Sequence, residues 1–199
     1  RLIYLLGQDQ KLDSSGSRII RYSTFNGGCY YKLSLFHFDS DVYDGKYFHT
    51  NTDFTQKGVY LVSIAKKTWF AWKYYFQYTV QVISPDECNV STIVPIDDFF
   101  FEVLDPTYCE NVTAIMISPP TNIIYPVGYT GEIDPSGIVV KPAKGWFPKK
   151  YDIADLDYTL ESDVDFNTPG SYIVKVTFED EKGREYWFCF TVAVAERAG

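Results

Sequence analysis

Apolar and polar residues alternate through most of the chain with a period of two, which is typical of half-buried β-strands. One pair of such segments covers residues 60–64 and 74–82, and a second pair covers residues 172–176 and 186–194. Aromatic and β-branched residues fill the alternating positions, whereas Gly, Pro, Asn and Asp separate the segments. No convincing run of apolar residues has helical spacing. The pattern predicts an all-β protein.

The chain also resembles itself. When residues 53–82 are placed on residues 165–194 without a gap, ten of the thirty positions are identical, where background usage of common residues would give about two. A shorter match, at a different offset, pairs Leu6-Gly7 with Val127-Gly128 and residues 12–16 with residues 133–137. We therefore expect two domains of similar build. The first spans 1–83, with an insertion at about 23–52 and a truncated N-terminal strand; a connector (84–111) leads to the second, at 112–195.

The second copy carries sequence motifs that point to a family. It contains Tyr125-Pro-Val-Gly128, Ile133-Asp-Pro-Ser-Gly137 and Asp165-Phe-Asn-Thr-Pro-Gly170-Ser-Tyr172. In these segments it resembles the bacterial Ig-like domains that are repeated on cell-surface proteins. The first copy has Lys57 where the second has Pro169. The resemblance implies two tandem Ig-like β-sandwiches with a role in adhesion, display or spacing, and it carries no catalytic residues.

A glycine and a tyrosine begin the penultimate strand of each copy. Gly58 and Gly170 stand two residues before Tyr60 and Tyr172. Each tyrosine is expected to enter the core, where its hydroxyl needs a partner. We predict a bond from this hydroxyl to nearby backbone, of the tyrosine-corner type.

Charge narrows the range of partners. The chain has 26 acidic and 18 basic residues and a formal net charge of -8, which disfavours binding to nucleic acid or anionic lipid. No stretch approaches the roughly 20 apolar residues that a membrane helix needs, so we expect no membrane insertion within the fragment.

Cysteines and glycosylation triplets suggest an extracellular location. Cys88 and Cys109 flank the connector, and a disulfide between them would close a loop of about twenty residues worth roughly 3 kcal/mol. Four reduced thiols in a cytosolic protein are the alternative. Cys189 falls on the outward phase of the last strand, so it is not expected to be the buried cysteine between the sheets of antibody domains. Asn89-Val90-Ser91 and Asn111-Val112-Thr113 fit the acceptor pattern for glycosylation, which is a weak signal.

Catalytic and metal-binding patterns are poorly represented. The two histidines, His37 and His49, lie in no metal or nucleophile motif. Acidic residues cluster at positions 39–44 and 152–165, but the spacing of an EF-hand is missing and turn-forming aspartates explain the clusters better. The sequence therefore predicts a protein that is not an enzyme and has no cofactor or metal.

The turn between the last two strands differs between the copies. The second copy has the polar residues 179–183, whereas the first has residues 67–71 with three large aromatic side chains, Trp69, Phe70 and Trp72, in or beside the turn. These aromatics are candidates for binding a protein or glycan at the cell surface. Alternatively they pack against the insertion or against Phe99-Phe100-Phe101 as an interdomain core.

The leading hypothesis is a non-enzymatic extracellular or cell-surface module for adhesion, display or spacing. The runner-up is a carbohydrate-binding module that stacks sugar rings on the aromatics of the first domain. The sequence leaves the ligand and the oligomeric state open.

Overall fold

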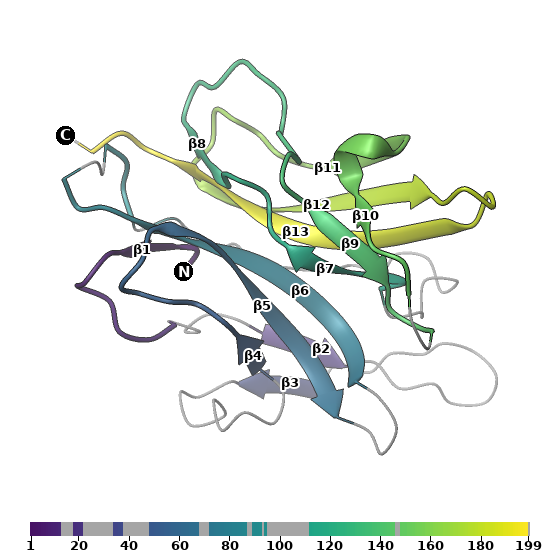
Figure 1. Cartoon of the computed structure of the whole chain (residues 1–199). Coiled ribbons are helices and arrows are strands. Elements are labelled where there is room, and N and C mark those ends of the chain that lie inside the picture. Colours follow the sequence, from purple (N-terminus) through teal and green to yellow (C-terminus); the bar gives the residue numbers. More distant parts are fainter. Residues whose placement is uncertain are drawn as a thin grey trace.

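A computed structural model of the chain describes residues 1–12, 18–21, 34–37, 48–67, 72–86, 89–92, 94, 112–145 and 148–198 (Figure 1). Their regular elements are β-strands apart from one short 3-10 helix, η3 (Ile153–Asp155). The prediction of an all-β protein is confirmed for these residues. Within the same ranges, no helix has the length and apolar character needed to cross a membrane.

The second copy forms two sheets that enclose one core, and it is sandwich-like. The smaller sheet has the order β10-β9-β7, and the larger has the order β11-β12-β13-β8. Buried residues from both sheets, among them Met116, Val140, Val176 and Phe190, form one apolar cluster between them. The strands are β7 (Ala114–Ser118), β8 (Ile124–Pro126), β9 (Val139–Pro142), β10 (Tyr151–Asp152), β11 (Tyr158–Ser162), β12 (Gly170–Glu179) and β13 (Glu185–Ala195).

The first copy contains a four-stranded sheet and a separate strand pair. The sheet has the order β1-β6-β5-β4, and β2 pairs with β3. A second apolar cluster includes Leu2, Tyr4, Val62 and Val80, together with Ala193 from the second copy. The strands are β1 (Ile3–Leu5), β2 (Arg18–Arg21), β3 (Ser34–His37), β4 (Phe48–Thr50), β5 (Gly58–Lys67) and β6 (Trp72–Ile83).

The two four-stranded sheets share their strand order and their register. In the first copy, β1 runs parallel to β6 with Ile3 opposite Gln81, and in the second β8 runs parallel to β13 with Ile124 opposite Ala193. Ile124 follows Ile3 by 121 residues, and Ala193 follows Gln81 by 112 residues. These are the offsets of the two sequence matches. The antiparallel pairs β5/β6 and β12/β13 also have the same register, at the offset of 112 residues, as far as Ile64. Ile64 lies opposite Phe76, and the equivalent residue Val176 lies opposite Phe188.

The predicted tyrosine bonds are present in both copies. The Tyr60 hydroxyl donates to the Gln56 carbonyl oxygen at 2.9 Å, and the Tyr172 hydroxyl donates to the Thr168 carbonyl oxygen at 2.8 Å. Each bond joins the start of a long strand to the turn before it.

The copies diverge toward the end of the hairpin. An irregularity between Ile64 and Ala65 places Ala65 opposite Tyr74, whereas Thr177, its counterpart in the ungapped alignment, lies opposite Trp187. Beyond this point the pairing in the first hairpin is shifted by one residue relative to the pairing in the second.

Candidate functional site

The predicted aromatic site is only partly within the described structure. Trp69 and Phe70 lie outside the described residues. Trp72 is the first residue of β6 and pairs with Lys67 through the backbone, while its side chain is outside the described part. The binding site at these residues and the alternative of an interdomain core both remain predictions.

The predicted disulfide and glycosylation sites are also only partly within the described structure. Cys88, Cys109 and Asn111 lie outside the described residues, so that pairing and that acceptor stay predictions. Asn89 is exposed, and its carbonyl oxygen accepts a hydrogen bond from the Ala198 amide at 2.8 Å. This contact fixes the backbone of the triplet and leaves its modification a prediction.

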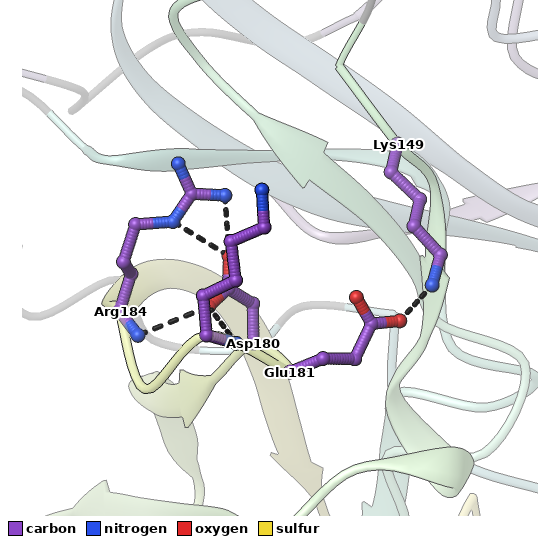
Figure 2. Close-up of polar contacts among 5 residues, drawn as sticks. Lys149, Asp180, Glu181 and Arg184 are labelled. Carbon is purple, nitrogen blue, oxygen red and sulfur yellow. Dashed lines mark hydrogen bonds and ion pairs between the residues drawn. The ribbon is translucent and has the colours of Figure 1, made fainter.

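The turn between β12 and β13 is organised around a buried carboxylate (Figure 2). The Asp180 side chain is 1% exposed and forms an ion pair with Arg184. It accepts hydrogen bonds from the amides of Lys182 at 2.9 Å and Arg184 at 3.0 Å, and from the Arg184 Nε at 2.8 Å. The Arg184 contact is the main cause that lowers the pKa of Asp180 to about 2. Glu181, in the same turn, forms an ion pair with Lys149, which lies two residues before β10. The Asp180 carboxylate is thus held by the turn itself.

Among the described residues, the most densely hydrogen-bonded contact between the copies joins β6 to β13. Thr79 and Thr191, both 0% exposed, form four reciprocal hydrogen bonds. The amide of each donates to the hydroxyl oxygen of the other, at 2.9 and 3.2 Å. The hydroxyl of each donates to the carbonyl oxygen of the other, at 2.6 and 2.9 Å. We call this contact, with the two glutamines described next, the seam.

Two glutamines of β6 extend the seam on either side of Thr79. The Gln77 amide nitrogen donates to the Met116 carbonyl oxygen at 3.2 Å, and its Oε1 accepts from the Met116 amide at 2.7 Å. Gln81 Oε1 accepts from the Ile123 amide at 3.0 Å. Both glutamines therefore bind backbone groups of the second copy, in the way a neighbouring strand would.

Cys189 shows that the outward face of β13 is buried near the seam. It is absent from the core cluster between the two sheets, in keeping with its outward phase, yet it is only 1% exposed. An outward phase therefore does not lead to solvent here, because β13 packs against the first copy at Thr191. Burial raises the pKa of the Cys189 thiol above its ordinary value. Cys189 is free and is the one cysteine that the structure describes.

Within the acidic cluster at 152–165, Asp165 takes part in a turn. Asp165 accepts hydrogen bonds from the Thr168 hydroxyl at 2.7 Å and the Asn167 amide at 2.9 Å, and these bonds lower its pKa. Among the described residues, no group of three or more His, Cys, Asp or Glu is placed to hold a metal ion. The acidic residues at 39–44 lie outside that part of the chain.

Sequence reasoning did not single out the seam. The available signal was the identity of Thr79 and Thr191, two polar residues shared between the copies on the outward phase of their strands. Comparison with known protein families and with curated proteins gave no match.

Proposed function

We propose that the chain is a non-enzymatic module of an extracellular or cell-surface protein. In this proposal its two copies are tandem Ig-like β-sandwiches, and they serve adhesion, display or spacing toward a protein or glycan partner. The Cys88–Cys109 disulfide and the glycosylation of Asn89 and Asn111 belong to the same proposal, because both modifications occur in secreted proteins.

One observation carries the proposal: the same sheet is built twice, and a buried, hydrogen-bonded contact joins the two copies. Ile3 lies opposite Gln81 as Ile124 lies opposite Ala193, and Thr79 and Thr191 link the sheets. A scaffold of this kind holds its loops in fixed positions, and loops on a rigid scaffold are where binding usually resides.

The arrangement of the copies favours display or adhesion over in-line spacing. The two long hairpins lie side by side at the seam, with β6 next to β13 (Figure 1). Gln77, Thr79 and Gln81 contact Met116, Thr191 and Ile123 in turn, so one copy docks along the flank of the other. Two copies docked side by side form a shorter spacer than two copies stacked end to end. Side-by-side docking instead places the loops of both copies on one scaffold.

An adhesion assay tests this proposal. The chain would be displayed on a non-adhesive bacterium and allowed to settle on immobilised glycans and on extracellular-matrix proteins. Cells that display the chain should adhere to at least one surface, and the Trp69→Ser/Phe70→Ser variant should adhere less if the aromatic turn contributes. A chain that supports adherence to no surface contradicts the adhesive role. Disulfide mapping of the secreted chain checks the compartment, since a free Cys88 would argue against it.

A further inference from the structure

The hydrogen bonds of the seam are reciprocal at its centre. Thr79 and Thr191 exchange the same two bonds in each direction, amide to hydroxyl and hydroxyl to carbonyl. They also occupy equivalent positions in the two copies, opposite Leu61 and Ile173 respectively. An interface in which each partner uses the same surface is isologous, and it has the local symmetry of a twofold dimer.

We propose that the outward faces of β6 and β13 are an isologous docking surface, which fits one further copy of the same fold and closes once two copies are joined. The amide, carbonyl and hydroxyl of each threonine are engaged by the other threonine. Nothing at the centre of the surface is left to bind a third copy. A heterologous contact would instead leave a free surface at each end and propagate. The pair of copies is thus the structural unit.

The residues on either side of the threonine pair determine which copy can dock on this surface. Gln77 and Gln81 of the first copy bind backbone groups of Met116 and Ile123 in the second. Their counterparts on β13 are Cys189 and an alanine, Ala193, neither of which carries an amide side chain. Two second copies would therefore form only the threonine centre and leave the flanking backbone groups without these partners. This difference favours pairing of a first copy with a second copy.

Hydrogen exchange at single residues tests the threonine centre. Thr191→Val removes the oxygen that accepts from the Thr79 amide, so exchange of that amide should rise about tenfold, the equivalent of one lost hydrogen bond. Thr191→Ser keeps the oxygen and should leave the rate close to that of the unmodified chain. Because the contact is reciprocal, Thr79→Val should raise exchange of the Thr191 amide by a similar factor.

Several outcomes would overturn the isologous centre. It fails if Thr191→Val leaves the Thr79 amide unchanged, if Thr191→Ser is as damaging as Thr191→Val, or if only one direction of the pair responds. Thr159→Val, at an exposed position of β11, is the matched control and should change neither rate. The unmodified chain offers a test that needs no substitution. Both threonine hydroxyl protons should exchange slowly enough to be seen by NMR, and fast exchange contradicts the buried contact.

A double variant tests the selective flanks separately. Gln77→Cys/Gln81→Ala gives the first copy the residues of the second, and exchange of both threonine amides should then rise together. Unchanged rates would refute the role of the glutamines in selecting the partner. The exchange rates do not depend on adhesion, so a failure here is distinct from a failure of the proposed function.

Discussion

Gln77→Leu is expected to destabilise the protein more than a surface substitution does. Gln77 is 4% exposed, and its side chain binds both the amide and the carbonyl of Met116. It also donates to the Ser63 hydroxyl oxygen at 2.9 Å. Leucine has a similar volume but no polar group. The Met116 amide and carbonyl would then be buried at the seam without their side-chain partner.

The magnitude follows from the groups left without partners. A buried donor or acceptor that loses its partner costs about 1–3 kcal/mol, so the two backbone groups of Met116 together cost about 2–6 kcal/mol. Apolar contacts of the leucine side chain offset part of this cost, by about 1–2 kcal/mol. The middle of these two ranges, about 4 minus about 1.5 kcal/mol, gives an expected net loss of about 2.5 kcal/mol, a large share of the roughly 5–15 kcal/mol that stabilises a typical domain.

Urea unfolding followed by circular dichroism measures this loss. Gln56→Leu is the matched control because Gln56 is exposed, and it should change the free energy of unfolding by no more than about 0.5 kcal/mol. A loss below about 1 kcal/mol for Gln77→Leu would contradict this prediction. It would mean that the Gln77 amide contributes little to the contact with Met116.

Four further predictions concern single residues. Tyr172→Phe should lower the free energy of unfolding by about 1 kcal/mol, the net value of one hydrogen bond, and urea unfolding that shows no loss contradicts a structural role for the Thr168 contact. The folded pKa of Asp180, about 2, lies below its ordinary value of 3.8, so its stabilisation is present above the unfolded pKa and is lost as the pH falls through about 2. The stability difference between the unmodified chain and Asp180→Asn, measured in urea, should therefore shrink from about pH 5 toward pH 2, and a constant difference argues against the linkage. Gly128→Ala should cost about 1–2 kcal/mol through backbone strain, since its φ is 82° and an added Cβ meets nothing within 4 Å; a neutral result in thermal unfolding would contradict that strain. Cys189 should react with a maleimide only after unfolding, as peptide mapping can show, and rapid labelling of the native chain would contradict its burial.

Much of the strand arrangement could be predicted from sequence, because two patterns determine it: the alternation of apolar and polar residues, and the match between the two copies. Alternation places Tyr60 and Val80 on one face of their strands, and the structure pairs them directly. The offset of 112 residues then predicts the equivalent pair, Tyr172 and Val192, which is also observed. The residues that the β core requires recur in both copies. The alignment of the two copies therefore also predicts which residues lie opposite each other in neighbouring strands.

The contact between the copies was not accessible in the same way. Alternation separates the face that meets a strand's own core from the opposite face, but it does not say whether the opposite face meets water or a second sheet. Cys189 is predicted on an outward phase, and Gln77 is its counterpart in the ungapped alignment; both are buried. The hairpin comparison had a related weakness, since the irregularity after Ile64 shifts the pairing without any sign in an ungapped alignment.

The docking of the two copies at Thr79 and Thr191 is tested most directly by nuclear Overhauser contacts measured in the isotopically labelled chain. We expect contacts from the Thr79 methyl group to the Thr191 amide and from the Thr191 methyl group to the Thr79 amide, because the two residues exchange four hydrogen bonds. Observation of both contacts would establish the seam in solution. Contacts confined to each copy, with Thr79 and Thr191 each near only its own sheet, would contradict the docking of the two copies.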